Sequence, residues 1–482
     1  MLDAAVIAVY LACVTAFGMR FRQKQSTLRG YFLAGQQVPW WAIALSVVSA
    51  ETSTLTIISV PGIAFEHDFR FLQLVIGYLI GRVIICLLLI PQYFRGELVT
   101  AYQLIDRRFG QRLRSLTAGL FLITRAAAEG VRVFAVAIVV GIALRGFLGG
   151  FSDFGRDVAA IAIVSLLTMI YTFKGGMAAV IWTDVVQLAV YMAGSIVALF
   201  TVLHLVPGGW HTAHSVAAGF GKFRVFDFSL DAHATYTFWS GVIGGAFLTT
   251  ASHGTDQLIV QRLLSARSER QSKVALMASG VMVLIQFSLF LLIGATLFVF
   301  YRIFPPAAPL TRTDAIFPVF IVSRMPHGVS GLLISAILAA AMGNLSAALN
   351  SLSSTTIVDF YSRLRPASSE ERRVRLSRMA TVVWCAVLFV LAIVARKGGR
   401  VLEMGLSIAS VAYGSMLGVF LLGVLTRRAN ERGAMIGMLC GFLLNLYLWQ
   451  FTNIPFTWYV PLGSAVTFAV GYALSPAPAE RV

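Results

Sequence analysis

The residues best suited to chemistry lie inside apolar stretches of the chain. Glu51 is the clearest case, because its carboxylate stands among hydroxyl side chains within segment 40–63. Polar groups are costly in hydrocarbon, so they are candidates for binding ions or solutes. This density predicts a broken helix that lines a cavity, since backbone groups freed at a break need polar partners. In the alternative, the helix is unbroken and its hydroxyls bond to i−4 carbonyls. The hydroxyl residues are Ser46, Ser49, Thr52, Ser53, Thr54 and Thr56.

Segment 236–258 is a counterpart of that first segment. Three glycines, Gly241, Gly244 and Gly245, precede a second polar run. Interrupted helices at corresponding positions of two halves indicate a binding site between inverted repeats. The glycines could instead serve close helix packing. From both segments together we predict a cavity lined by Glu51, Thr52, Thr56, Thr249, Ser252, His253 and Asp256.

Further polar groups interrupt other apolar segments. The run 343–359 is rich in Asn, Ser and Thr, and Asp184 lies about two turns inside a predicted span. Such oxygens suit a hard cation, although the Asn and Ser side chains could equally link helices. Asp184 needs a cation, an arginine or a proton to neutralise it. Arg82 could pair with Glu51 or Asp184, or extend toward the membrane surface.

One helix carries Arg125, Glu129 and Arg132 at spacings that allow ion pairs along a single face. We interpret this trio as structural. His253 is more typical of a hydrogen-bonded helix residue than of a metal ligand. The sequence contains no recognisable catalytic triad, metal cluster or phosphate loop, so an enzyme is not expected.

The composition indicates where these groups lie. Of the 482 residues, 58% are apolar and 12% are charged, whereas soluble domains have about 45–50% and about 25%. This excludes a soluble enzyme, a disordered chain and a nucleic-acid-binding protein. We predict an all-α integral membrane protein with about 13 spans of about 20 residues each. They lie near 4–19, 40–63, 71–93, 115–144, 158–173, 176–206, 236–258, 274–301, 329–360, 379–395, 401–425, 434–451 and 457–475.

The net charge of +17 is concentrated in alternate loops. Basic loops remain cytoplasmic, which predicts a multi-pass protein of the plasma (inner) membrane with its N-terminus outside and its C-terminus in the cytoplasm. Short surface helices are expected within 95–114 on the inner side and 316–325 on the outer side. The expected organisation is an extra N-terminal helix and inner loop (1–39), a first five-helix repeat (40–206), an outer loop (207–235), a second five-helix repeat (236–425), and two C-terminal helices with a tail (426–482).

Six segments resemble the sodium:solute symporter family. They are SAETSTLTIISVPG (49–62), PQYFRGELVTAYQLIDRRFG (91–110), KGGMAAVIWTDVVQ (174–187), GTDQLIVQRLLSARS (254–268), AAAMGNLSAALNSLSSTTIVDFY (339–361) and GVFLLGVLTRRANERGAMIG (418–437). The resemblance implies a LeuT-like 5+5 inverted-repeat core preceded by one extra helix.

The resemblance also implies a sodium site between the broken first core helix and the eighth. Its ligands would fall at Leu45, Val48, Ala340, Gly343 and Asn344. The family normally has Ser or Thr at the last two positions, and Gly343 supplies no side-chain oxygen. Asp184, with Ser346 as a companion, matches a further cation site found in some members.

The predicted function is secondary active transport, in which Na+ and a small organic solute cross together by alternating access. Two alternatives remain open: a proton carried by Glu51 replaces Na+, or the chain is a solute sensor that does not transport. No cofactor is expected besides Na+ or H+ as the coupling ion. The expected partners are the lipid bilayer and a small solute, with intramembrane arginines favouring an anion. The chain is expected to be a monomer and to bind no nucleic acid.

Overall fold

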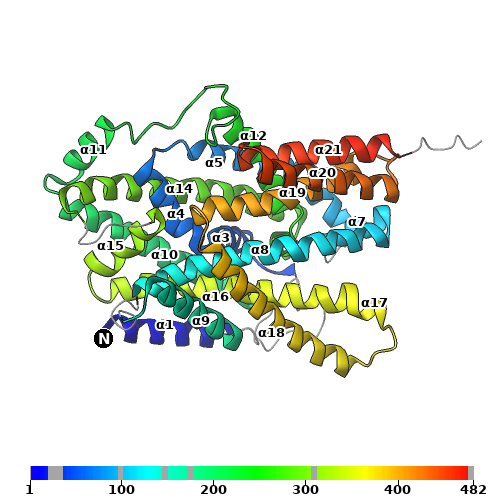
Figure 1. Ribbon diagram of the computed structural model, residues 1–482, viewed down its shortest axis with the longest axis horizontal. Coiled ribbons are helices and arrows are strands. Elements are labelled where there is room, and N and C mark those ends of the chain that lie inside the picture. Colours follow the sequence, from blue (N-terminus) through cyan, green and yellow to red (C-terminus); the bar gives the residue numbers. More distant parts are fainter. Residues whose placement is uncertain are drawn as a thin grey trace, which may run out of the picture.

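The computed structural model describes residues 2–19, 36–95, 101–143, 150–171, 177–305 and 312–475. Within these ranges the chain forms helices joined by turns and loops, and Val38 and Ala266 form an isolated backbone bridge. Most helices run along the long axis of the molecule (Figure 1). The all-α prediction is therefore confirmed.

Each predicted span coincides with a helix or with a consecutive set of helices. The first half contains α1 (Leu2–Met19), α3 (Trp40–Glu51), α4 (Thr54–Glu66), α5 (Leu72–Ile84), η3 (Ile85–Leu89), α6 (Ile90–Arg95), α7 (Tyr102–Phe109), α8 (Gln111–Ala143), α9 (Asp153–Tyr171) and α10 (Met177–Leu205). The second half contains α11 (Gly209–Gly219), α12 (Phe238–Gly254), α13 (Gln257–Leu264), α14 (Glu269–Ile303), η4 (Thr313–Ala315), α15 (Ile316–Arg324), α16 (Val329–Thr355), η5 (Thr356–Tyr361), α17 (Ser362–Leu364), α18 (Glu370–Ala395), α19 (Val401–Leu425), α20 (Glu431–Phe451), η6 (Phe456–Trp458) and α21 (Tyr459–Ala473).

Eight helices among the described residues are long and apolar enough to cross a bilayer, and the bent pair α3 and α4 would make nine. The remaining predicted spans correspond to α1, α9, α12 and α21, which are not among the selected helices. The count of about thirteen spans, each of about 20 residues, therefore stays a prediction.

Both predicted helix breaks are present. α3 and α4 meet at an angle of 66° across Thr52 and Ser53. α12 ends at Gly254, and α13 begins after Thr255 and Asp256. The hydroxyl-rich sequence of the first break and the Gly–Thr–Asp sequence of the second therefore mark the points where the helices stop.

The glycines of α12 serve close packing, as the alternative interpretation proposed. A Cβ at Gly245 would lie 2.2 Å from the carbonyl oxygen of Leu74, and one at Gly241 would lie 2.9 Å from the Cβ of Gln73. Gly77 on α5 faces α12 in the same way, and a Cβ there would lie 2.4 Å from the carbonyl oxygen of Val242. α5 and α12 thus approach to backbone contact, which small residues permit.

The two ends of the molecule carry different short helices (Figure 1). α11 and α15 lie at one end, called here the α11 end, and α7 and α17 lie at the opposite end, called the α7 end. α15 confirms the helix expected within 316–325, and α7 confirms the helix expected within 95–114.

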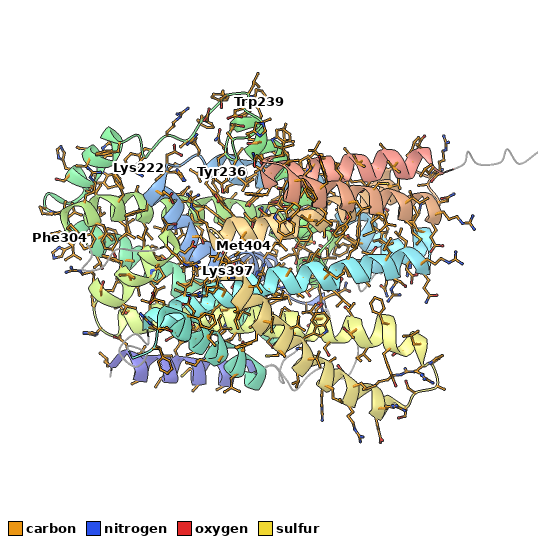
Figure 2. All side chains as sticks on the ribbon, viewed as in Figure 1. Lys222, Tyr236, Trp239, Phe304, Lys397 and Met404 are labelled. Atoms are coloured by element: carbon orange, nitrogen blue, oxygen red, sulfur yellow. The ribbon has the colours of Figure 1, made fainter. Side chains whose placement is uncertain are left out.

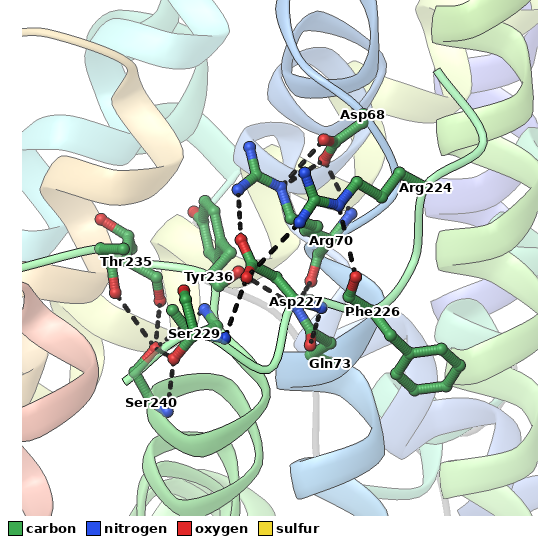
Figure 3. Close-up of polar contacts among 12 residues, drawn as sticks. Asp68, Arg70, Gln73, Arg224, Phe226, Asp227, Ser229, Thr235, Tyr236 and Ser240 are labelled. Atoms are coloured by element: carbon green, nitrogen blue, oxygen red, sulfur yellow. Dashed lines mark hydrogen bonds and ion pairs between the residues drawn. The ribbon is translucent and has the colours of Figure 1, made fainter. Parts of the chain in front are cut away.

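A loop at the α11 end, residues 220–237, is fastened to the turn between α4 and α5 (Figure 3). Arg70 Nη1 donates to Asp227 at 2.8 Å, and the backbone N–H of Asp227 donates to Gln73 at 3.0 Å. Lys222, which lies near α11 (Figure 2), donates through Nζ to the carbonyl oxygens of Phe65 and His67 at 2.6 and 2.8 Å. A cation therefore satisfies the C-terminal carbonyls of α4.

Candidate functional site

A cavity of about 170 Å³ lies where the two helix breaks meet. α3 and α4 pack against α14, α3 packs against α10, and α19 packs against α8 and α12, so helices of both halves enclose the site. The cavity brings together six of the seven residues predicted to line it: Glu51, Thr56, Thr249, Ser252, His253 and Asp256.

The seventh predicted lining residue, Thr52, lies at the break but is not among the lining residues. It is buried, and its hydroxyl forms a hydrogen bond with the side chain of Gln286 on α14, with oxygen–nitrogen distance 2.7 Å. Ser53, the next residue, lines the cavity instead. The bend turns successive residues toward different neighbours, which a sequence pattern does not specify.

Glu51 closes the first half-helix and pairs with Arg82 of α5. Its carboxylate also lies 3.2 Å from His253 Nε2, and Ser252 Oγ lies 2.9 Å from the other ring nitrogen. The Arg82 side chain is fully buried and donates further to Ser279 and to the carbonyl oxygen of Tyr78, each at 3.3 Å. Arg82 therefore pairs with Glu51, and this contact ties the break of α3 to α5 and α12.

Asp256 holds the second break through two of its oxygen atoms. One accepts the backbone N–H of Leu258, which caps α13, at 2.9 Å. The other accepts from Tyr413 Oη at 3.0 Å and from Arg125 Nη1 at 3.4 Å. The carboxylate thus connects the start of α13 with α19 and α8, and it has a structural role as well as a place in the cavity wall.

The arginine–glutamate trio on α8 forms as the spacing predicted. Glu129 Oε1 lies 3.0 Å from Arg125 Nε and 2.8 Å from Arg132 Nη1. The Arg132 side chain is 29% exposed, whereas those of Arg125 and Arg262 are 9% and 4% exposed. Arg132 is therefore the most accessible guanidinium among these three cavity-lining arginines.

Asp184 on α10 is neutralised by an arginine that the sequence interpretation did not identify as its partner. Arg262 Nη2 of α13 lies 3.0 Å from Asp184 Oδ2, and Ser46 Oγ of α3 donates to the same oxygen at 2.6 Å. Arg262 Nε also donates to Ser46 at 2.9 Å. Asp184 and Arg262 are far apart in the sequence, so spacing could not pair them; only the fold brings α10, α3 and α13 together.

The residues that the family resemblance assigned to sodium lie on α3 and α16. Leu45 and Val48 precede the break, and the Val48 carbonyl accepts the Thr52 N–H at 2.8 Å. Ala340, Gly343 and Asn344 lie on α16, where Asn344 lines the cavity. A Cβ at Gly343 would meet no atom within 4 Å. Ser346, the proposed companion of Asp184, is buried on the same helix.

Aromatic and aliphatic walls complete the cavity, and the sequence interpretation missed them. Phe71 and Phe287 stack with ring centroids 5.3 Å apart, and Leu402 and Leu406 line the cavity from α19. These residues lie in predicted spans, where hydropathy gives no sign of which helix face meets a cavity. A site with apolar walls and a few converging polar groups suits a small organic ligand.

Comparison with known proteins identifies the chain's relatives. The sodium:solute symporter family model matches residues 31–441. The sodium/sialic acid symporter SiaT of Proteus mirabilis is 30% identical over 490 residues, covering 100% of this chain and 96% of that protein. The sodium/sialic acid symporter NanT of Aliivibrio fischeri is 28% identical, covering 98% of this chain and 93% of that protein.

Solved structures agree with this assignment. A Na+-coupled sialic acid symporter in a substrate-bound outward-open state superposes with a TM-score of 0.84 at 29% identity, covering 100% of this chain and 99% of that one. Mhp1, a nucleobase-cation-symport-1 family transporter, superposes with a TM-score of 0.57 at 12% identity and supports the fold alone. The chain thus has the LeuT-like inverted-repeat architecture that its resemblance to the family implied, and its two broken helices fit inverted repeats.

These findings favour Na+ coupling over the proton-coupled and non-transporting alternatives, and they confirm that the chain is a transporter and not an enzyme. The chain belongs to the sodium:solute symporter family and is a multi-pass membrane protein that couples solute transport to Na+ by alternating access.

Proposed function

We propose that this symporter takes up a sialic acid or a closely related sugar acid. The observation that carries the proposal is the pairing of two anion-binding features in one cavity. Ser53, the N-cap of α4, lines the cavity, so the positive end of that half-helix faces it. The second feature is the guanidinium of Arg132, the most accessible of the three cavity-lining arginines compared above. Whole-length similarity to two sialic acid symporters supports the same substrate class.

In this proposal Arg132 turns from Glu129 to the carboxylate of the solute. Guanidinium groups bind carboxylates through two parallel hydrogen bonds, which fixes the orientation of the ligand. The apolar walls at Phe71 and Leu402 pack against the carbon skeleton, and Thr56 and Thr249 offer hydroxyls to the sugar. A neutral sugar would lack the group that Arg132 recognises.

We further propose that the coupling Na+ binds at Leu45, Val48, Ala340, Gly343 and Asn344, where backbone and amide oxygens are available. A second cation would bind Asp184 and Ser346. In the present conformation Arg262 neutralises Asp184. Binding of a second cation there would therefore require Arg262 to move away.

We propose that the protein lies in the plasma membrane. Its α11 end and N-terminus would face the outside of the cell, and its C-terminus would lie in the cytoplasm. The two repeats, residues 40–206 and 236–425, would move relative to each other. We also propose that the transporting unit is a monomer.

Uptake into proteoliposomes tests the substrate class. With an inward Na+ gradient, labelled sialic acid should accumulate and should be displaced by unlabelled sialic acid but not by a neutral hexose. Arg132→Gln should raise the KM by about 10- to 100-fold, because a charge-assisted hydrogen bond contributes about 1.5–3 kcal/mol. Arg302→Gln, which removes an arginine packed on Phe220 at the α11 end, is the matched control. Equal KM values in the two variants would contradict the assignment of Arg132.

A further inference from the structure

A second cavity lies at the α7 end, between α7, the last turns of α19 and the segment around Gln92. Its volume is about 270 Å³. Its walls are largely apolar and include Leu104, Phe109, Phe420 and Val424. α7 packs against α19. The cavity therefore lies between a short helix of the first half of the chain and the last helix of the predicted second repeat.

Two arginines line this apolar cavity. Arg107 is exposed, and Arg108 is partly exposed. Arg108 donates through Nη2 to the carbonyl oxygen of Thr426 at 3.1 Å and lies 4.9 Å from the ring centroid of Phe109. Both of these partners are uncharged, so they position the guanidinium of Arg108 without neutralising it.

Two carboxylates near the cavity have partners of their own among the described residues. Asp106 pairs with Arg114 at 2.9 Å. Glu431 accepts the backbone N–H groups of Arg112 and Leu113 at 2.8 and 3.3 Å, which caps the start of α8. Further arginines follow α19 at Arg427, Arg428 and Arg432. The described residues that line the cavity thus include two arginines and no carboxylate.

We propose that this cavity binds an acidic phospholipid. The phosphate of the headgroup would contact Arg107 and Arg108, and an acyl chain would lie along Leu104, Phe420 and Val424. In the proposed orientation the α7 end faces the cytoplasm, and basic pockets between membrane helices on that side are suited to anionic headgroups. The apolar walls would contact the acyl chain. The bound lipid would join α7 to α19. This site is separate from the solute cavity and does not depend on which solute is carried.

Lipid-dependent thermal stability of the purified full-length chain tests the proposal. In a neutral detergent, added phosphatidylglycerol should raise the melting temperature by about 3 °C or more, and phosphatidylcholine should raise it by less than half as much. Inorganic phosphate at the same concentration should give no comparable shift, because it supplies no acyl chain. A phosphate shift as large as the phosphatidylglycerol shift would overturn the proposal that the occupant is a lipid.

Paired variants locate the effect. Arg107→Gln with Arg108→Gln should abolish the difference between the two lipids. Arg372→Gln with Arg375→Gln removes the same charge from exposed positions on α18 and should preserve that difference. If the first pair impairs folding through loss of the Thr426 contact, Arg107→Gln alone changes an exposed residue and should still lose at least half of the phosphatidylglycerol shift. An unchanged shift in the folded Arg107 variant would overturn the site.

Discussion

Arg262 of α13 and Asp184 of α10 form an ion pair of 3.0 Å, and Ser46 of α3 forms hydrogen bonds with both partners. Both side chains are buried, at 4% and 10% exposure. This contact ties the half-helix after the second break to two helices of the first half. It also places a fixed cation where the proposed second coupling ion would bind, so ion binding and movement of α13 would be linked.

Breaking this pair should be costly. Asp184→Asn leaves the Arg262 guanidinium buried without its counter-ion, a change worth about 3–5 kcal/mol of stability. We expect a strongly lowered melting temperature in detergent, partly restored in the double variant Asp184→Asn with Arg262→Gln. Asp153→Asn is the control, because Asp153 forms an ion pair with Arg156 but is 87% exposed, and exposed pairs contribute about 0–1 kcal/mol. Equal melting temperatures for the two single variants would contradict this account.

Gly343→Ser should strengthen sodium coupling. The family resemblance places a hydroxyl at this position, and open space surrounds the site of its Cβ. A serine would therefore add an oxygen ligand without steric strain. The Na+ concentration for half-maximal uptake should fall by about three- to tenfold. Gly343→Ala is the matched control, since it adds the Cβ without the oxygen, and it should leave that concentration unchanged. The prediction fails if serine and alanine behave alike.

Gly245→Ala should destabilise the contact between α5 and α12. The added Cβ would lie 2.2 Å from the carbonyl oxygen of Leu74 and 3.1 Å from the Cα of Gly77. Overpacking of this kind costs about 1–3 kcal/mol or more, because backbone atoms must move. Gly219→Ala adds the same methyl group on α11, where nothing lies within 4 Å. Thermal unfolding monitored by intrinsic tryptophan fluorescence should separate the two variants, and coincident curves would refute the packing argument.

The loop at the α11 end should detach only at acidic pH. The backbone N–H of Ser229 lowers the pKa of Asp227 below its usual 3.8, and Arg70 and Arg224 lower it further. Because the folded pKa is depressed, this stabilisation is present above the unfolded pKa and is lost as the pH falls through the folded value. Hydrogen exchange of residues 224–238 should be constant between about pH 5 and 8, after correction for the intrinsic rate.

Asp227→Asn should mimic the acidified loop at neutral pH. It removes the charge that pairs with Arg70 at 2.8 Å, and exchange within residues 224–238 should accelerate by about fivefold or more. Asp231→Asn is the control, because Asp231 accepts the backbone N–H of His233 within the same loop and is exposed. Acceleration of the same size in both variants would show that the ion pair does not fasten the loop.

The sequence predicted the elements of the fold better than the partners of their side chains. Apolar runs marked the helices, and the polar run around Glu51 marked the break between α3 and α4, because a freed backbone requires hydroxyls nearby. The local trio on α8 also formed as its spacing predicted, since residues three and four apart share a helix face.

Local sequence spacing could not specify which side chains from distant segments would contact each other. Arg262 approaches Asp184 only because α13 folds back against α3. For Arg82 the sequence offered Glu51 as one of two partners, and the packing of both α3 and α5 against α14 brings Arg82 to Glu51. The same limit explains Thr52, whose hydroxyl turns from the cavity to Gln286. Single-sequence periodicity assigns a residue to a helix face but not to the helix opposite it.

Uptake of labelled sialic acid into proteoliposomes under separately imposed gradients tests the central claim most directly. The account predicts accumulation above equilibrium when an inward Na+ gradient is the only driving force. It predicts collapse of that accumulation when the Na+ gradient is dissipated, and no accumulation when an inward proton gradient acts without Na+. Accumulation driven by protons in the absence of Na+ would contradict the account, as would binding of sialic acid without any uptake.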